Sequence, residues 1–287
     1  MIAQEISNIK SSKKANSCNS EGLSRLYYSQ SLLLKNCGAL EDALSSIAQA
    51  LSFSPYDPII IKALCDILEA KASRPAANLG LIFSCEKYIS RAARVAKILS
   101  HPAVPFKVKI VVGADAAVAN INNLMKVKAK DTYEALPAKV CSAYMEIASN
   151  YAAPTNIFKI DDDINISDIE LFSSSCFSLI SSNIDYAGFP VGTPYHDRTW
   201  HWNKCSEEKL NRFIYTKRFN GAWANGPFYY LSAKALRSFV IARYQFPGES
   251  EGELYEDKFV GDVLRQGNID LTPLNPKAFT IRADNMN

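Results

Sequence analysis

The chain has 287 residues, of which 48% are hydrophobic, 11% aromatic and 21% charged, a composition typical of globular proteins. This composition excludes a wholly disordered or fibrous chain, and the length allows one large domain or a medium domain with an appendage. The 32 basic and 29 acidic residues give a net charge of +3, which provides no electrostatic reason to expect a nucleic-acid partner.

The sequence also bears on membranes and compartment. Its apolar runs fall short of the roughly 18–20 residues that span a bilayer, so we expect no transmembrane segment. The N-terminus lacks the apolar core of a secretory signal. The seven cysteines form no CxxC pair, which argues against a zinc cage. We expect reduced thiols in a cytoplasmic protein, either free or peripheral to the inner face of a membrane.

The first 75 residues are predicted to form a tail and a helical segment. Residues 1–20 are rich in Ser, Asn and Lys and are expected to be disordered. Residues 21–75 carry apolar side chains at helical spacings of three and four. The last of these helices is expected to run from Pro58 to about Ala72, with Asp57 as its N-cap.

Part of this region, residues 38–58, resembles the second half of a tetratricopeptide repeat. The small-residue, close-packing and helix-stop places of the repeat are filled by Gly38, Ala43, Ala50 and Pro55. A stable solenoid needs about three repeats. A helical hairpin packed on the next domain and a repeat that binds a protein partner therefore both remain open.

After a linker at 72–80 the pattern changes to short apolar runs that alternate with helical segments. These runs predict strands at 79–85, 108–115, 156–160, 184–191 and 228–232. The alternation favours an α/β domain with a largely parallel sheet over residues 76–287. Ligands of such sheets bind beyond the carboxyl ends of the strands, so polar residues that follow strands are candidate site residues.

Three acidic residues, Asp161, Asp162 and Asp163, directly follow the strand predicted at 156–160. Adjacent carboxylates repel one another at neutral pH, and a divalent cation such as Mg²⁺ or Mn²⁺ would supply the counter-charge. Alternate residues of an extended segment face the same way, so Asp161 and Asp163 are candidate ligands of one ion. Asp162 would then point elsewhere, for example to a sugar hydroxyl. A solvated acidic turn is the alternative.

Two later segments carry weaker signals. Glu256 and Asp257 precede an apolar helical pattern, where they either complement the helix dipole or provide a general base. Gly221 and Gly226 are expected to build a tight turn beside Trp223. Glycine lets a ligand approach the backbone and an aromatic face stacks on a sugar ring, although a buried turn with core aromatics would show the same pattern.

Four segments in the same order resemble glycosyltransferase family 31, which holds β-1,3-galactosyl- and N-acetylglucosaminyltransferases and Fringe-like enzymes. The family pattern K-x-D-D-D-v-f-v is similar to residues 159–166, and E-D-V-y-v-G is similar to residues 256–261. The pattern C-s-G-x-G-Y-v-l-S is similar to residues 224–232. The pattern D-x-Y-x-N-L-t-x-K is similar to residues 131–139, which keep Asp131, Tyr133, Leu136 and Lys139. The resemblance covers about residues 79–270.

This resemblance implies a GT-A fold with a Rossmann-like nucleotide-binding sheet. It implies that a UDP-sugar donor gives a hexose or N-acetylhexosamine to a hydroxyl with inversion, usually in a β-1,3 linkage. The acceptor would be a saccharide or lipid-linked saccharide in polysaccharide or glycolipid synthesis. By the same resemblance, Asp161 and Asp163 would hold Mn²⁺ or Mg²⁺ against the diphosphate, and Asp257 would deprotonate the acceptor hydroxyl.

Binding roles also follow from the matched segments and their surroundings. The predicted nucleotide-sugar-binding residues are Arg91, Asp131, Lys139, Asp162 and Gly226, and the predicted acceptor-binding residues are Trp202, Trp223 and Glu256. The loop 195–204, which includes Trp202 and His201, is expected to recognise the acceptor or the donor sugar. A surface loop anchored by its tryptophans is the alternative.

The chain departs from the family pattern in several places. The family usually places a metal-binding histidine after the E-D motif, but this chain's histidines all precede it: His101, His196 and His201. Asp284, Asn285 or water are candidates for that place. The second glycine of G-x-G is Phe228, and the V of E-D-V is Lys258. The N-terminal membrane anchor and luminal disulfides usual in eukaryotic members are not expected, so a bacterial or viral enzyme fits better.

Two other functions remain open. The main alternative is a helical-repeat adaptor with a protein partner at its N-terminal helices and a catalytically degenerate sugar-nucleotide-binding domain. A phosphoryl-transfer or hydrolase domain that uses the acidic triplet ranks lower, because the chain lacks a G-x-x-x-x-G-K-[ST] loop.

Overall fold

The computed structural model describes residues 18–119, 121–191 and 197–283. The helices are α2 (Cys18–Asn36), α3 (Leu40–Phe53), α4 (Pro58–Lys71), α5 (Ile89–Ile98), α6 (Leu136–Asn150), α7 (Ile169–Ile180), α8 (Ala233–Gln245), α9 (Glu256–Gln266) and α10 (Pro276–Phe279). The strands are β1 (Asn78–Phe83), β2 (Lys107–Gly113), β3 (Leu124–Val127), β4 (Asn156–Asp161), β5 (Ile164–Ile166), β6 (Tyr186–Val191), β7 (Trp223–Leu231), β8 (Thr272–Pro273) and β9 (Ile281–Ala283).

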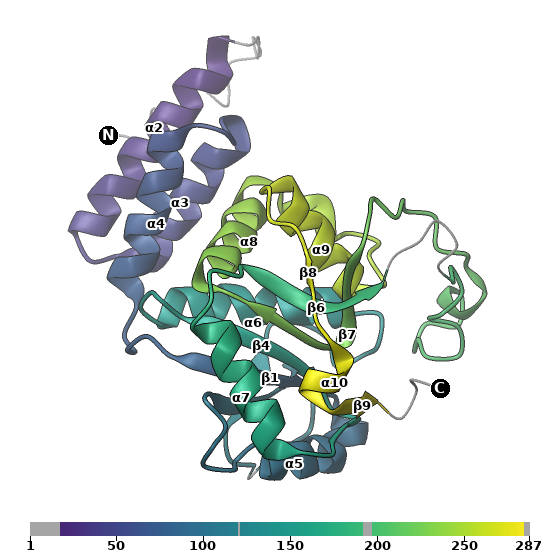
Figure 1. The fold of residues 1–287 in the computed structure, drawn as a ribbon. Coiled ribbons are helices and arrows are strands. Elements are labelled where there is room, and N and C mark those ends of the chain that lie inside the picture. The colour runs from purple at the N-terminus through teal and green to yellow at the C-terminus, as the bar shows by residue number, and fades with distance from the viewer. Residues whose placement is uncertain (1–17, 120, 192–196, 284–287) are drawn as a thin grey trace.

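Seven strands of the described ranges form one mixed sheet in the order β3-β2-β1-β4-β7-β6-β8. The strands β1 to β4 pair in parallel, β7 runs antiparallel to both β4 and β6, and β8 is parallel to β6. A small second sheet pairs β5 with β9. The predicted α/β fold with a mostly parallel sheet and an N-terminal helical appendage is therefore confirmed (Figure 1).

Helices cover both faces of the sheet (Figure 1). The helices α6, α8 and α9 pack on one face, and α5, α7 and α10 lie on the other. Successive residues of β4 alternate between the two cores: Ile157 joins the first, and Phe158 and Ile160 join the second. This alternation aims Lys159 toward the face that carries α9.

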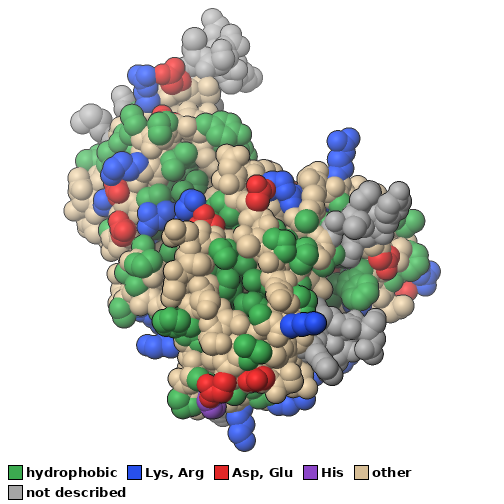
Figure 2. Space-filling model, viewed as in Figure 1, with side chains coloured by type: hydrophobic (Ala, Val, Ile, Leu, Met, Phe, Trp, Pro, Cys, Tyr) green, Lys and Arg blue, Asp and Glu red, His purple; other side chains and the backbone are tan. Residues whose placement is uncertain are grey.

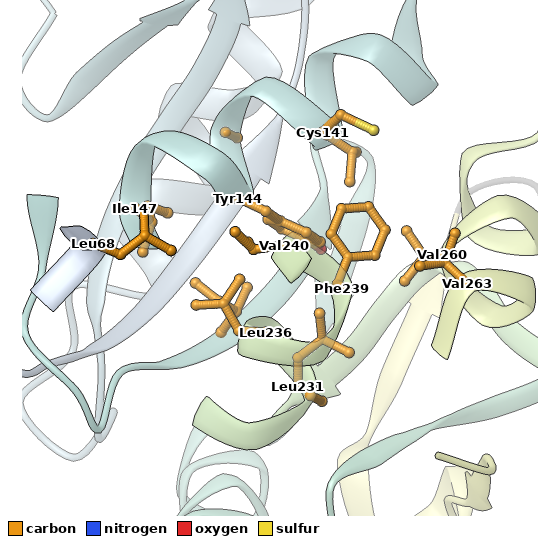
Figure 3. Close-up of a cluster of buried hydrophobic side chains, with 14 of the residues drawn as sticks. Leu68, Cys141, Tyr144, Ile147, Leu231, Leu236, Phe239, Val240, Val260 and Val263 are labelled. Carbon is orange, nitrogen blue, oxygen red and sulfur yellow. The ribbon is translucent and has the colours of Figure 1, made fainter. Parts of the chain in front are cut away.

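The N-terminal helices pack directly on the sheet domain. Gly38 takes the left-handed backbone angle φ of 77° that turns the chain from α2 into α3. The predicted N-cap of α4 is confirmed, because the Asp57 carboxylate accepts a hydrogen bond from Ile59 N at 2.8 Å. The helix α3 contacts α8 and α4 contacts α6. Figure 3 shows Leu68 of α4 beside Ile147 of α6 in one continuous hydrophobic cluster.

The structure differs from the sequence predictions in a few elements. The helix α2 begins at Cys18, inside the tail predicted at 1–20, and residues 1–17 of that tail lie outside the described residues. The prediction of a tight turn around Gly226 is wrong, because this residue lies within β7. Gly188 of β6 pairs with Tyr229 and Pro190 pairs with Ala224, so the extra residues 225–228 form a bulge on β7 itself. This bulge accommodates the Pro227 nitrogen, which cannot donate to a ladder.

Two properties of the surface bear on partners. None of the helices in the described part of the chain combines the length and the apolarity that crossing a bilayer requires. On the face shown in Figure 2, acidic and basic side chains are interspersed and no broad basic region stands out. This distribution agrees with the small net charge of the chain.

Candidate active site

The three motifs that were singled out in the sequence meet at one edge of the sheet. The acidic triplet lies at the end of β4, and β7 runs antiparallel to β4, so the first residues of β7 lie beside the triplet. The helix α9 packs on β7 and begins at Glu256. Residues that are far apart in the sequence thus share one charged cluster.

Lys159 ties this cluster together. Its buried ammonium Nζ lies 2.5 Å from Asp161 Oδ1 and 2.6 Å from Glu256 Oε1. It also donates a hydrogen bond to the carbonyl oxygen of Gly226 in β7. One lysine of β4 therefore fixes the end of its own strand, the start of β7 and the start of α9.

The charges of the cluster shift one another's protonation. Burial alone would lower the pKa of Lys159, but the carboxylates of Asp161 and Glu256 outweigh burial and raise it. Burial raises the pKa of Glu256 to about 7 against the opposing effect of Lys159. The second oxygen of Glu256 accepts a hydrogen bond from the Tyr229 hydroxyl at 3.3 Å, and Tyr144 donates to Tyr229 at 2.9 Å.

Asp257 is held by backbone donors on both of its carboxylate oxygens. Oδ2 accepts from Gly226 N at 3.1 Å, and Oδ1 accepts from Lys258 N at 2.7 Å. Burial raises its pKa above that of an ordinary aspartate, and the negative charge of Asp161 acts in the same direction. A fixed carboxylate with a raised pKa is suited to general base catalysis.

Gly226 brings its backbone close to this cluster. A Cβ atom at this position would lie 3.5 Å from Asp161 Oδ2, and 3.6 Å from both Glu256 Oε1 and Lys159 Nζ. These are ordinary contact distances, so a methyl group fits sterically but would be surrounded by charged atoms. The glycine leaves this space to polar groups.

Asp161 and Asp163 are chemically suited to share a divalent cation. Carboxylate oxygens are hard ligands that Mg²⁺ and Mn²⁺ prefer. Burial and the nearby charges of Asp161 and Asp162 raise the pKa of Asp163, a repulsion that a bound cation would relieve. Within residues 18–119, 121–191 and 197–283, no three His, Cys, Asp or Glu side chains are grouped so that the protein alone could hold a metal. A metal at this place would therefore need further oxygen ligands from outside the protein.

Asp162 points away from the charged cluster toward β1 and α5. Its carboxylate accepts from the Ser84 hydroxyl at 2.5 Å and from Arg91 at 2.5 Å. The Arg91 guanidinium also lies 4.0 Å from the ring centroid of Tyr88. Burial raises the pKa of Asp162 despite these donors. The predicted nucleotide-binding residues Arg91 and Asp162 thus form one ion pair beside the acidic triplet.

Asp131 and Lys139, two further predicted nucleotide-binding residues, form a second ion pair at 2.8 Å. Lys139 is buried and donates to the Ser84 carbonyl at 2.7 Å. The Asp131 carboxylate also accepts from Gly113 N at 2.7 Å and from Glu86 N at 2.6 Å. This pair holds the ends of β1 and β2 together and reaches Asp162 through Ser84.

The residues predicted to bind the acceptor lie in different environments. Trp202 is 37% exposed and its Nε1 donates to the Phe213 carbonyl at 2.8 Å. Trp223 is 1% exposed and its ring stacks on Phe219, so the structure places it in the core rather than at an open surface. Glu256 is buried beside Lys159.

The segment 197–222 contains most of the predicted recognition loop. Buried side chains attach it to the residues that precede α9. His201 is buried, with Nδ1 3.0 Å from the Tyr255 hydroxyl and Nε2 2.9 Å from the Phe213 carbonyl. The Tyr215 hydroxyl donates to Glu253 at 2.5 Å. These contacts attach the segment to the residues directly before α9. His196, Asp284 and Asn285, named in the sequence analysis, lie outside the described residues.

Sequence reasoning missed Lys159 and Ser84 as site residues. A lysine inside an apolar strand must find a partner when buried, and Asp161 lies two residues later on the same side of β4. That spacing was a usable signal for Lys159. Ser84 follows β1 directly, but nothing in its sequence surroundings indicates that its hydroxyl reaches Asp162.

Comparisons with known proteins give one family match for this chain. Residues 107–275 match the family described as Galactosyltransferase, a range that includes the acidic triplet and Asp257. Among curated proteins no match was found. A solved structure assigned as a glucose-1-phosphate thymidylyltransferase from Bacillus anthracis, in complex with a sucrose, is 10% identical, with a TM-score of 0.36. That match covers 70% of this chain and 87% of the other.

Proposed function

Because the chain belongs to the galactosyltransferase family, we propose that it is a metal-dependent, inverting glycosyltransferase that uses a UDP-sugar donor. The donor would carry a hexose or N-acetylhexosamine, and the acceptor would be a sugar hydroxyl in a polysaccharide or glycolipid, with a β-1,3 linkage. The observation that carries this proposal is the Asp257 carboxylate, which the backbone of Gly226 and Lys258 fixes beside the acidic triplet.

The chain's own residues account for most of the proposed mechanism. Asp257 accepts the proton of the acceptor hydroxyl as its oxygen attacks the anomeric carbon from the face opposite the leaving group. The ion pairs of Lys159 with Asp161 and Glu256 hold the end of β4 next to the start of α9. The base and the acidic motif therefore keep a fixed separation. Arg91 and Asp162 border the place where the nucleotide would lie.

Asp161 and Asp163 would hold the metal together with oxygens of the donor. When bound, Mn²⁺ or Mg²⁺ neutralises the negative charge that develops on the departing UDP. Asp161 is oriented for this role by its ion pair with Lys159.

A panel of UDP-hexoses and UDP-N-acetylhexosamines tests the proposal. We expect UDP release from one class of donor with Mn²⁺, and loss of that release with a chelator. Asp163→Ala should weaken UDP binding in the presence of Mn²⁺ by about tenfold or more, whereas the exposed Asp270→Ala should bind like the wild type. Wild-type UDP binding by Asp163→Ala would exclude the metal assignment, and no UDP release from any donor would contradict the proposed activity.

A further inference from the structure

Lys204 is a basic residue near the acidic triplet that forms no salt bridge with the described part of the chain. Its Nζ lies 3.8 Å from the ring centroid of Trp200 and 5.7 Å from that of Tyr133. Two aromatic faces therefore hold the ammonium in place, as cation–π contacts do. Neither ring neutralises the charge.

The chain directly after Lys204 is fixed by hydrogen bonds. Cys205 N donates to the Asn211 side chain at 3.0 Å, and Ser206 N donates to the Glu134 carboxylate at 3.1 Å. Glu134 follows Tyr133 in the segment that carries Asp131 and Lys139. Lys204 is thus attached to the side of the sheet on which the predicted nucleotide-binding residues lie.

The charges of two aspartates, one of them in the acidic triplet, act on the Lys204 ammonium. Partial burial lowers its pKa, while the carboxylates of Asp197 and Asp163 act in the opposite direction. Tyr133, which is in contact with Lys204, itself interacts with the charges of Asp257 and Asp161. The Lys204 side chain is nevertheless exposed, so a ligand from solution can reach its ammonium. A cation that is held by aromatic rings and has no ion pair attracts an anionic ligand.

We propose that Lys204 binds the diphosphate of the nucleotide-sugar donor, held in position by Trp200 and Tyr133. This inference rests on the proposed function. In that reaction the bond between the anomeric carbon and the β-phosphate oxygen breaks, and its electron pair stays on the oxygen. The acceptor oxygen forms the new bond, and its proton passes to Asp257. Lys204 stabilises the charge gained by the diphosphate and transfers no proton.

Three variants of the full-length chain test this role: Lys204→Ala, Lys204→Arg and the control Lys209→Ala. Lys209 lies on the same segment, is exposed and pairs with Glu207 at 2.9 Å. Binding of UDP with Mn²⁺ is measured by calorimetry, and binding of uridine by ligand-observed NMR. We expect Lys204→Ala to weaken UDP binding at least tenfold and uridine binding less than twofold. Lys204→Arg should stay within about threefold of the wild type, and Lys209→Ala should match it.

Two results would overturn the inference while the wild type binds UDP normally. One is UDP binding by Lys204→Ala equal to that of Lys209→Ala. The other is a parallel loss of uridine and UDP binding, which would mean that Lys204 only supports the structure of the loop. Absence of UDP binding by the wild type would instead contradict the proposed function, and this inference with it.

Discussion

Two buried lysines, Lys139 and Lys159, hold the acidic groups of the site in place. An isolated ammonium in the protein interior is unfavourable, so each lysine needs carboxylate partners. Lys139 is paired with Asp131, and Lys159 is paired with Asp161 and Glu256. Removal of one partner of such a buried pair leaves an uncompensated charge and typically costs about 3–5 kcal/mol of stability.

Asp131→Asn tests this argument through the pH dependence of stability. Burial opposes ionisation of Asp131, but Lys139 and the backbone donors outweigh it and lower its pKa. A lowered pKa adds stability above the ordinary carboxyl pKa of about 3.9, and this stability is lost as the pH falls toward the lowered value. We expect Asp131→Asn to lose about 3 kcal/mol of unfolding free energy at pH 7, in denaturant titrations, and less at pH 3.

Asp66→Asn is the matched control for this measurement. Asp66 pairs with Lys62 at 2.7 Å on the exposed side of α4, where an ion pair is worth less than about 1 kcal/mol. An equal cost for both substitutions, or a cost of Asp131→Asn that stays constant from pH 7 to pH 3, would contradict the role of the buried pair.

The acidic residues of the site could be predicted from the sequence, whereas most of the contacts that hold them could not. Asp161, Asp163 and Asp257 stand out because they follow a strand or begin a helix, and such positions are visible in one sequence. The contacts of Lys159 with Gly226 and Glu256 depend on how β7 and α9 are placed against β4. No local pattern encodes that placement.

At the scale of elements, long apolar runs were predicted correctly, whereas short strands were missed. Of the bulged strand β7, only the second half was predicted, as a strand at 228–232. The strands β1, β2, β4 and β6 follow buried runs that stand out in the sequence. The strands β3, β5, β8 and β9 have two to four residues each and were missed, since so few residues form no pattern. The tight turn expected at Gly226 is instead part of β7, and the paired residues Ala224 and Phe228 flank it on either side.

The helix α9 also shows how one departure from the family pattern is accommodated. Lys258 stands where the family pattern has valine, and its side chain is buried. Its Nζ lies 2.9 Å from Asp262 one turn later and 3.4 Å from Glu253 before the helix. Glu253 also accepts from Tyr215 of the segment 197–222. The lysine therefore links the helix that carries Asp257 to the segment 197–222, which contains most of the predicted recognition loop.

At the scale of the whole molecule, the helical appendage and the sheet domain share one hydrophobic core. Buried side chains from α3 and α4 belong to the same cluster as those from α6, α8 and α9. Figure 3 shows Leu68 of α4 among side chains of these three helices. The separate domains predicted at residues 21–75 and 76–287 are thus in continuous apolar contact. We expect the two parts to unfold together.

Leu64→Ala tests this coupling. Leu64 is fully buried in α4, so its truncation should cost about 2–5 kcal/mol. The three tryptophans, Trp200, Trp202 and Trp223, all lie outside the appendage, so their fluorescence reports on the sheet domain alone. We expect the denaturant midpoint from tryptophan fluorescence to fall together with the midpoint from circular dichroism. The control is Ile59→Ala, at an exposed position of α4. It should change the free energy of unfolding from either signal by no more than about 0.5 kcal/mol. A fluorescence midpoint that does not move would show that the appendage unfolds independently.

The proposed activity depends most directly on Asp257, and the most direct measurement is the rate of sugar transfer by Asp257→Asn under saturating donor and Mn²⁺. The substitution keeps the size of the side chain but removes the base, so the rate should fall by about 10²–10⁴-fold. UDP affinity should stay within about threefold of the wild type, and the exposed Asp270→Asn should retain the full rate. A transfer rate of Asp257→Asn equal to that of the wild type would contradict the assignment of Asp257 as the catalytic base.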